Sequence, residues 1–484
     1  MDLNQRLLKQ SSYINGQWQP VTDSTFTVQN PANGEEVAVI ASATADDAAA
    51  AVAAASEAMP AWQVLPAKNR SRILKRWFDL IMLHKDDLAA ILTAEQGKPF
   101  KESLGEIIYG ANYIEWFAEE AKRVYGDTIP QPSNDKRLVV IKQPVGVVSA
   151  ITPWNFPSSM ITRKAAPAMA VGCTFIVKAA EETPLSALAL AVLAEEAGVP
   201  PGVFNVIATS DSRSIGKVLT GDSRVAKFSF TGSTPVGKIL LKQCADTVKK
   251  TTMELGGNAP FIVFDDADLD AAIEGVLESK FRNAGQTCVC SNRIFVQEGI
   301  YDDFAKQLVS KVNEFSLGEG FSEDTDIGPL INKGAADSVN KLVVNASRSG
   351  AKILTGGAAS ELGNAFYQPT VLGDVTDKMD IFQQEIFGPV APLIKFSTEE
   401  QVIQFANDTE FGLAAYMYAR DIGRIWRVSE ALEYGMVGIN EGIISNPMAP
   451  FGGVKQSGMG REGSKYGIDD YLEIKYLCMG GLDS

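Results

Sequence analysis

Cys288 stands where a nucleophile is expected, at the junction between a predicted helix and a predicted strand. It lies in the segment 281–295, which reads Phe-Arg-Asn-Ala-Gly-Gln-Thr-Cys-Val-Cys-Ser-Asn-Arg-Ile-Phe. Apolar residues at helical spacing predict a helix over Ala267–Arg282, and β-branched and aromatic residues predict a strand over Ser291–Gln297. A thiolate at such a junction can face a cleft, so this residue is the best nucleophile that the chain offers. The alternative is a small buried hydrophobe, the usual place of a free cysteine.

A single histidine, His84, restricts the choice of general base. It lies within a predicted amphipathic helix, Ala67–Gln96, among Lys and Asp residues, and is expected at the surface. Histidine clusters and Cys-x-x-Cys pairs are both absent from the sequence, so no metal site is expected. Any general base is therefore expected to be a carboxylate.

Composition and charge exclude several classes of function. The 484 residues exceed one ordinary core and predict two or three domains. A net charge of −15 disfavours binding to nucleic acid or to an anionic membrane surface. No apolar run is long enough to span a bilayer. Five cysteines without regular spacing fit a reducing compartment, so we expect a cytoplasmic protein.

Strands and helices alternate from Gly146 onward, which predicts an α/β fold with parallel sheets. The first unit has the pattern of a doubly wound, dinucleotide-type (Rossmann-like) domain, and a second α/β unit begins near Thr251. A small β arm is expected to combine the segment Arg123–Pro144 with the C-terminal strand near Asp470–Cys478. Exposed strand edges in this arm favour pairing with another subunit, as a homodimer or homotetramer.

A glycine-rich turn, Gly232-Ser-Thr-Pro-Val-Gly-Lys238, follows a predicted strand and opens a predicted helix, which is the placement that a phosphate site requires. Gly232 and Ser233 are therefore candidates for binding a phosphate. The spacing also matches a Walker A loop, but Ile239 replaces the residue whose hydroxyl would hold Mg²⁺, so a nucleoside triphosphatase is not expected. A simple strand-to-helix turn is the alternative.

Lys178 ends a predicted strand one βα unit earlier, and Glu181 lies three residues on. Both would face the ligand crevice at the carboxyl edge of a parallel sheet. A carboxylate there suits the hydroxyls of an adenosine ribose and would repel a 2′-phosphate, which favours NAD over NADP. The alternative is an exposed ion pair that opens a loop.

These patterns divide the chain into three predicted parts. Residues 1–122 and 145–253 are assigned to a dinucleotide-binding domain, and residues 254–460 to a catalytic domain. Residues 123–144 and 461–484 are assigned to the oligomerisation arm. Ligands are expected at the carboxyl ends of the parallel strands.

Several motifs, in order along nearly the whole chain, resemble the signatures of the aldehyde dehydrogenase superfamily. They are Ile151-Thr-Pro-Trp-Asn-Phe-Pro157, Phe230-Thr-Gly-Ser233, Met253-Glu-Leu-Gly-Gly-Asn258, Gly285-Gln-Thr-Cys288 and Glu385-Ile-Phe-Gly-Pro389. Two stretches, Phe281–Arg293 and Pro450–Tyr466, resemble succinate-semialdehyde dehydrogenases more closely. The resemblance implies the aldehyde dehydrogenase fold and an NAD(P)-dependent oxidation of succinate semialdehyde to succinate.

The resemblance assigns the chemistry to three residues. Cys288 would attack the aldehyde carbon to give a thiohemiacetal, and hydride transfer to the nicotinamide would leave a thioester. The Asn155 amide and the Cys288 backbone N–H would form an oxyanion hole. Glu254, beside the flexible Gly256-Gly257 pair, would activate the water that hydrolyses the thioester.

The same resemblance implies the cofactor site. The residues implied to bind the adenosine, the phosphates and the nicotinamide ribose are Trp154, Lys178, Glu181, Ser233, Glu385 and Phe387. The cofactor expected is NAD, with NADP as the alternative. Ala179 follows Lys178 where many relatives have Pro, so this loop is expected to be less rigid.

Three residues are implied to hold the substrate carboxylate: Arg163, Arg282 and Ser445. Two guanidinium groups in the cleft of an acidic protein suit a small anionic aldehyde. The alternative is two helix-terminal arginines that bond carbonyls or nearby acids. Other substrates left open are glutarate semialdehyde and uncharged aliphatic aldehydes. Rival functions are a non-redox thioester hydrolase or acyltransferase, and a non-catalytic scaffold.

Cys290 follows the nucleophile by two residues. A packed core residue is one interpretation. The other is a reversible disulfide between Cys288 and Cys290 that stops activity under oxidation. The strain of so short a loop would make this bond labile.

Overall fold

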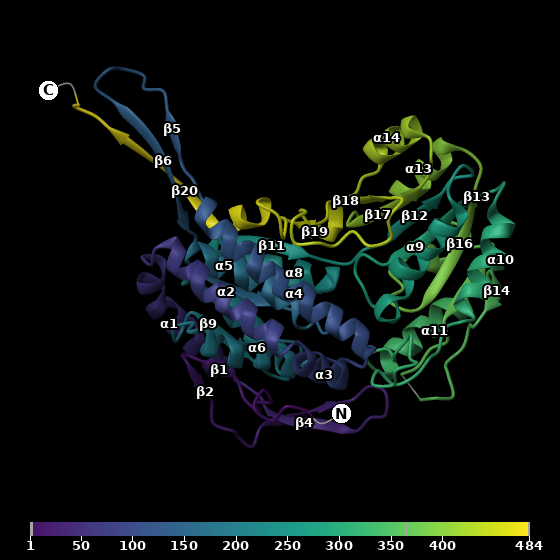
Figure 1. The fold of residues 1–484 in the computed structure, drawn as a ribbon, viewed down its shortest axis with the longest axis horizontal. Coiled ribbons are helices and arrows are strands. Elements are labelled where there is room, and N and C mark those ends of the chain that lie inside the picture. The colour runs from purple at the N-terminus through teal and green to yellow at the C-terminus, as the bar shows by residue number, and fades with distance from the viewer. Residues whose placement is uncertain (1–2, 364, 483–484) are drawn as a thin grey trace.

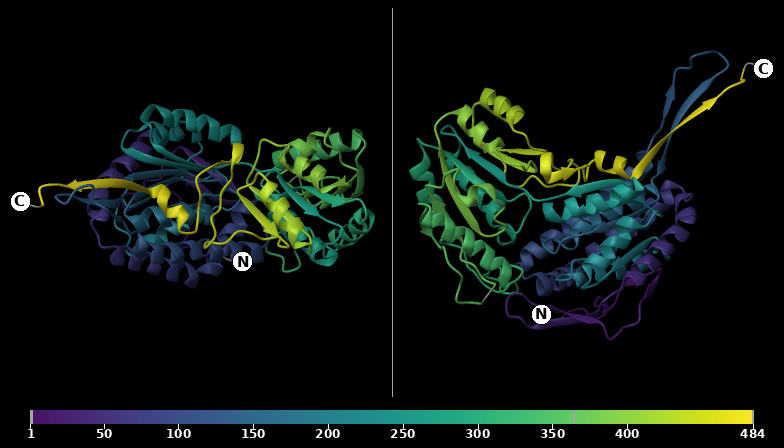
Figure 2. Two further views of the ribbon diagram at one scale, coloured as in Figure 1. Left: turned by 90° about the horizontal axis from the view of Figure 1, so that it is seen from above. Right: turned by 180° about the vertical axis from the view of Figure 1, so that it is seen from behind.

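Two largely parallel β-sheets, each with helices packed against it, form the cores of the protein, and a thin β arm projects from one of them (Figure 1). The structure is a computed structural model that describes residues 3–363 and 365–482. Figure 2 shows the two sheet-centred bodies side by side, with the arm pointing away from both. The arrangement is the α/β architecture that the alternation of strands and helices predicts.

The first sheet has eight strands, and its five central strands run parallel. In spatial order the strands are β19 (Gly458–Met459), β11 (Lys250–Glu254), β10 (Val225–Thr231), β7 (Val147–Ile151), β8 (Thr174–Lys178), β9 (Phe204–Ile207), β1 (Tyr13–Ile14) and β2 (Gln17–Trp18). β8 and β9 are buried throughout, as expected for inner strands of a parallel sheet that is covered on both faces. Short antiparallel strands border the sheet at both edges.

The chain changes its direction of travel across this sheet between β7 and β10. It passes from β7 outward through β8 and β9, then returns to β10 on the other side of β7 and continues to β11. At such a switch point the carboxyl ends of the two central strands leave a crevice for a ligand. Trp154 and Asn155 follow β7, and Gly232 and Ser233 follow β10, so these predicted site residues lie at the crevice.

Most helices of the N-terminal half pack against this sheet or against one another. They are α1 (Ala45–Gln63), α2 (Ala67–Leu83), α3 (Lys85–Gln96), α4 (Phe100–Glu120), α5 (Ser159–Val171), α6 (Pro184–Ala197), α7 (Ser212–Gly221) and α8 (Thr234–Cys244). The predicted single helix Ala67–Gln96 is wrong, because the chain leaves the helical conformation at His84, with φ −104° and ψ 19°. Asp86 and Asp87 in the first turn of α3 favour a new helix start. His84 is half-buried, with Nδ1 3.2 Å from the Asp87 carboxylate.

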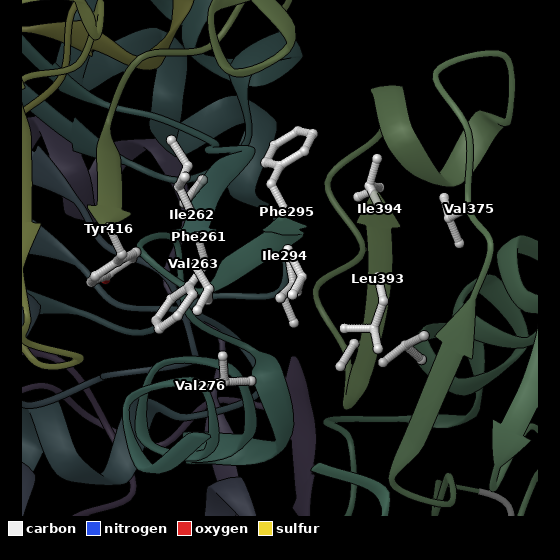
Figure 3. Close-up of a cluster of buried hydrophobic side chains, with 14 of the residues drawn as sticks. Phe261, Ile262, Val263, Val276, Ile294, Phe295, Val375, Leu393, Ile394 and Tyr416 are labelled. Atoms are coloured by element: carbon white, nitrogen blue, oxygen red, sulfur yellow. The ribbon is translucent and has the colours of Figure 1, made fainter. Parts of the chain in front are cut away.

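The second sheet has seven strands, all parallel except the edge strand β14. In spatial order they are β14 (Lys352–Thr355), β15 (Thr370–Gly373), β16 (Val390–Phe396), β13 (Ser291–Gln297), β12 (Ala259–Val263), β17 (Ala414–Tyr418) and β18 (Met436–Ile439). Its helices are α9 (Leu269–Phe281), α10 (Tyr301–Val312), α11 (Lys333–Arg348), α12 (Asp380–Gln383), α13 (Glu399–Asn407) and α14 (Ile422–Ala431). Figure 3 shows the core between these elements, in which Phe261, Ile294 and Leu393 are fully buried.

The arm is a three-stranded antiparallel sheet built from segments far apart in the sequence. It consists of β5 (Asp127–Ile129), β6 (Arg137–Pro144) and β20 (Leu472–Met479). β20 and β6 pair along their whole length, from Leu472 opposite Pro144 to Met479 opposite Arg137. Every residue of β20 after Leu472 is exposed.

The smaller elements are a hairpin of β3 (Thr25–Gln29) with β4 (Glu36–Ala41), and the 3-10 helices η1 (Ala121–Arg123), η2 (Ala245–Thr247), η3 (Arg282–Gly285), η4 (Lys455–Ser457) and η5 (Tyr466–Tyr471).

The division of the chain into three domains stays a prediction. β11 belongs to the first sheet as far as Glu254, one residue beyond the predicted boundary, and β19 returns from the C-terminal part of the chain to the same sheet. Residues 1–2 and 483–484 of the predicted parts lie outside the described residues. Within the described part of the chain, no helix is both long and apolar enough to cross a bilayer.

Candidate active site

Two cavities meet at Cys288. The first has a volume of about 260 Å³ and lies in the crevice of the first sheet. Among its lining residues are the predicted site residues Trp154, Asn155, Gly232, Ser233, Glu254, Glu385 and Phe387. The second has a volume of about 250 Å³, and among its lining residues are Arg163, Arg282 and Ser445. Cys288, Phe156 and Met160 line both cavities, so the nucleophile candidate stands where the two spaces join.

A turn with unusual backbone conformation presents Cys288. After α9 the chain passes through η3, where Asn283 and Ala284 have φ values of 50° and 53°, in the left-handed region. Gly285 follows with φ 75°, and a Cβ there would lie 2.2 Å from the carbonyl oxygen of Gly388. Only glycine fits at this position. The turn then enters β13, as the sequence predicts.

Desolvation keeps the thiol of Cys288, which is half-buried, protonated at rest. Loss of solvent raises the pKa of this thiol to about 12, since the positive charge of Arg163 offsets only part of the desolvation. The charge of Glu254 adds to the increase. Because the thiolate is the reactive form of cysteine, the resting thiol is a weak nucleophile.

Asn155 lies in the loop after β7, with its side chain buried and held at one point. Its Nδ2 donates to the carbonyl oxygen of Gln286 at 2.9 Å, on the turn that leads to Cys288. Its Oδ1 is buried without a hydrogen-bond partner among the described residues. An amide nitrogen carries two protons, so one donor of Asn155 remains for a ligand.

Glu254 ends β11 and is 4% exposed. Its Oε2 has no hydrogen-bond partner within the described part of the chain. Desolvation, reinforced by the negative charge of Glu462, raises the pKa of Glu254 well above its ordinary value. The carboxyl group therefore keeps its proton to a higher pH than an ordinary carboxyl group does, and it gains basicity as the pH rises.

Glu462 and Lys164 are parts of the site that the sequence analysis missed. Lys164 forms an ion pair with Glu462 and donates to Thr231 Oγ1 at 2.6 Å, and Arg163 Nη2 lies 2.7 Å from Glu462 Oε2. Although burial opposes ionisation, these two cations hold the pKa of Glu462 below its usual range. The signal available in the sequence was the Arg-Lys pair within α5, a helix whose residues are otherwise almost all uncharged and buried.

Aromatic rings and glycines are among the residues that line the first cavity. Trp154 and Phe387 pack edge to face, with ring centroids 5.6 Å apart. Glu385 accepts a hydrogen bond from the Gly257 N–H at 3.0 Å, and burial raises the pKa of Glu385 to about 7. A Cβ at Gly256 would lie 2.7 Å from Glu385 Oε2, so a side chain there would displace the carboxylate.

Lys178 and Glu181 do not line either of these two cavities. Lys178 ends β8 with 5% exposure, and burial lowers the pKa of its amine. Glu181 is exposed and lines a separate cavity of about 410 Å³, together with Glu182 and Ser210. Their assignment to the adenosine ribose stays a prediction.

The two arginines that line the second cavity differ in their surroundings. Arg163 is buried, forms an ion pair with Glu462 and is stacked on Phe451, with 4.0 Å from its guanidinium carbon to the ring centroid. The pair with Glu462 is the contact with a nearby acid that the alternative interpretation allowed, although Nε and Nη2 of Arg163 have no hydrogen-bond partner among the described residues. Arg282 is half-buried over Phe156, with 5.6 Å to the ring centroid.

Cys290 is 6% exposed and packs behind the turn. Its Sγ donates to the carbonyl oxygen of Lys280, with 3.4 Å between sulfur and oxygen. These contacts suit a packed core residue. The disulfide with Cys288 stays a prediction.

Comparison with known proteins agrees with this geometry. A model of the aldehyde dehydrogenase family matches residues 18–477. The chain belongs to the aldehyde dehydrogenase family. The resemblance stated from the sequence motifs is thereby confirmed, and so is the aldehyde dehydrogenase fold.

Two curated relatives match this aldehyde dehydrogenase over nearly their whole length. One is 3-sulfolactaldehyde dehydrogenase from Pseudomonas putida, 58% identical over 478 residues that cover 99% of this chain and 98% of that protein. Another is the NADP(+) succinate-semialdehyde dehydrogenase GabD from Escherichia coli K12, 57% identical over 99% of this chain and 100% of that protein. A crystal structure of succinate-semialdehyde dehydrogenase from Burkholderia pseudomallei has a TM-score of 0.97, at 57% identity and 99% coverage of both chains.

The raised pKa of the Cys288 thiol predicts slow alkylation near neutral pH. Because the thiolate fraction is small and proportional to hydroxide, the rate of modification by iodoacetamide should rise about tenfold per pH unit between pH 7 and 9. The measurement is mass spectrometry of the peptide that contains Cys288. A Cys290→Ala background leaves Cys288 as the one thiol of this peptide. A plateau below pH 9 would contradict the buried, neutral thiol.

Proposed function

We propose that this aldehyde dehydrogenase oxidises succinate semialdehyde to succinate with a nicotinamide dinucleotide as the oxidant. The observation that carries the proposal is that Cys288 lines both cavities at once. Asn155 and Glu254 line the cavity on one side, and Arg282 and Ser445 line the cavity on the other. The relatives named succinate-semialdehyde dehydrogenase support this choice of substrate.

The first step uses Cys288 and Asn155. The S–H bond of Cys288 breaks as the sulfur attacks the aldehyde carbon, and its proton leaves to solvent. A carbon–sulfur bond forms, and the carbonyl oxygen takes the electron pair. The free N–H of the Asn155 amide and the backbone N–H of Cys288 would donate to this oxygen. Because the bond to Gln286 already fixes the amide, its second donor needs little reorganisation.

The crevice of the first sheet fits a dinucleotide. The side chain of Ser233 does not cap α8, so the N–H groups at the start of that helix remain available to a phosphate. Val236 and Ile239, both substantially exposed on α8, offer apolar surface to a planar ring. Glu385 and Phe387 line the deeper part of the cavity. When bound, the nicotinamide accepts the hydride that leaves the substrate carbon.

Glu254 is the residue that we assign to hydrolysis of the thioester. Its unpaired Oε2 belongs to a side chain that lines the same cavity as Cys288, so a water between the two can give up a proton to it. Since the pKa of Glu254 is raised, its basic form becomes populated at a higher pH than that of an ordinary carboxyl group. Hydrolysis is therefore expected to accelerate with pH.

The substrate carboxylate is assigned to Arg282, Ser445 and Arg163, which line the same cavity. The charge of Arg163 is partly balanced by its ion pair with Glu462, so Arg282 is assigned the larger share. The relative named for 3-sulfolactaldehyde also takes an aldehyde with an anionic group. Glutarate semialdehyde, which is one methylene longer, is retained as a second substrate.

Replacement of Arg282 tests the carboxylate site. Wild type is expected to prefer succinate semialdehyde over butanal by about 10²-fold or more in kcat/KM, because butanal lacks the charge-assisted hydrogen bonds. Arg282→Met should remove most of this preference by lowering kcat/KM for succinate semialdehyde and leaving butanal nearly unchanged. Steady-state reduction of the cofactor measures both values. Equal kcat/KM values for the two aldehydes in wild type would contradict the assignment of an anionic substrate. If neither aldehyde led to reduction of the cofactor, a thioester hydrolase or a scaffold would be favoured.

Glu181 leads us to propose NAD as the preferred cofactor, although the Escherichia coli relative is named for NADP(+). A carboxylate beside the ribose would repel a 2′-phosphate. Glu181→Gln should therefore lower KM for NADP more than KM for NAD, while kcat stays similar. A wild type that prefers NADP, or a variant with an unchanged ratio of the two KM values, would show that Glu181 does not contact the ribose.

We also propose a homodimer or homotetramer formed through the β arm. Ile474 and Tyr476 on β20 are 71% and 56% exposed, which suits an edge that pairs with another subunit. A monomer by light scattering would contradict the proposal.

All five cysteines are free, which supports the cytoplasmic location expected from their spacing.

A further inference from the structure

A fully buried ion pair connects α4 to the joint between α3 and α4. Lys98 Nζ lies 2.8 Å from Glu106 Oε2, and the two side chains are 0% and 1% exposed. Such a pair is costly to bury and is weak evidence of a role in stability. Its position beside the loop that carries Asn155 points instead to a role in arranging the site.

The remaining contacts of Lys98 reach this loop. Nζ donates to the carbonyl oxygen of Asn155 at 2.7 Å and lies 4.0 Å from the centroid of the Phe156 ring. An ammonium has three protons, and these two contacts together with Glu106 account for all three. Lys98 lines neither of the two cavities that meet at Cys288, so its charge serves the protein and not a ligand.

Glu106 extends the contact to the next helix. Its Oε1 accepts hydrogen bonds from the N–H groups of Ser158 at 3.0 Å and Ser159 at 3.1 Å. These groups lie at the N-terminus of α5, where the backbone donors have no partner within the helix and a negative charge is favourable. The ion pair therefore holds the segment 155–159 at both ends.

The same carbonyl oxygen of Asn155 is also bonded to the turn that presents Cys288. Asn283 Nδ2 donates to it at 3.0 Å, and the Asn283 N–H donates to Glu102 Oε2 at 2.7 Å. Asn283 is the first of the two left-handed residues in that turn. One oxygen atom thus connects Lys98, the loop that carries Asn155, and the turn that leads to the nucleophile.

We infer that Lys98 is a positioning residue for the proposed oxyanion hole. Its ammonium fixes the Asn155 peptide, and through this peptide it fixes the side-chain amide that donates to Gln286. The inference rests on the proposed aldehyde oxidation. Freedom of about 1 Å at the amide would weaken transition-state stabilisation by about 10²-fold, whereas binding of the substrate carboxylate at Arg282 would not change.

The test uses the full-length enzyme with both charges of the ion pair removed, as Lys98→Met/Glu106→Gln, so that no unpaired buried charge remains. The double variant should fold, with kcat for succinate semialdehyde lowered about 10²-fold and KM changed by less than about threefold. The rate of Cys288 alkylation should change far less than kcat, because Glu102 still accepts from the Asn283 N–H and holds the turn that presents the thiol. Lys101→Met is the matched control, since Lys101 is 61% exposed and pairs with Asp326 at the surface.

A folded double variant with wild-type kcat would overturn the inference. A rise in KM in proportion to the loss of kcat/KM, with kcat unchanged, would overturn it as well, because that result indicates loss of substrate binding. If the double variant does not fold, Lys98→Gln/Glu106→Gln keeps a neutral hydrogen-bonded pair, and the same criteria apply. Failure of the proposed function is distinguishable, because wild type itself would then not oxidise the aldehyde.

Discussion

Burial at the joint between the two sheets is the constraint on which the active site depends. Cys288 precedes β13 of the second sheet and Glu254 ends β11 of the first, yet both line one cavity. Withdrawal from water raises the pKa of each group, so both the thiol and the carboxyl group keep their protons to a higher pH than they would in water. Nearby, the buried charges of Lys164 and Arg163 are paired with Glu462. The site is therefore withdrawn from water at rest. Its hydrogen-bond donors are placed to meet the negative charge that develops on the substrate oxygen.

Much of the fold could be predicted because its signals are local. Alternating strands and helices predicted the parallel sheets, and the turn at Gly232 between a strand and a helix predicted the crevice. Cys288 was found in the same way, from a helix that ends and a strand that begins around it. The arm was found from strands with exposed edges. The break at His84 was missed because the apolar periodicity continues through it, and a packing contact such as the bond from Trp77 Nε1 to the Leu190 carbonyl has no signature in the sequence.

The parts of the site that could not be predicted depend on contacts between distant segments. Glu462 is 298 residues from Lys164, and nothing in its local sequence marks this carboxylate as buried. The bond between Arg163 and Glu462 has the same origin, so the sequence alone left open whether Arg163 serves a ligand or a nearby acid. Glu181 illustrates the opposite difficulty. The rule for strand ends predicted its side of the sheet, but only the structure shows that it lines a different cavity from Cys288.

The central claim is that Cys288 carries the acyl group and Glu254 is needed to release it. The most direct test mixes Glu254→Gln with succinate semialdehyde and NAD, follows cofactor reduction by stopped flow, and examines the acid-quenched protein by peptide mass spectrometry. The account predicts one equivalent of reduced cofactor per active site, little further turnover, and a succinyl thioester on Cys288. Continued turnover at the wild-type rate, or a burst without an acyl group on Cys288, would contradict it.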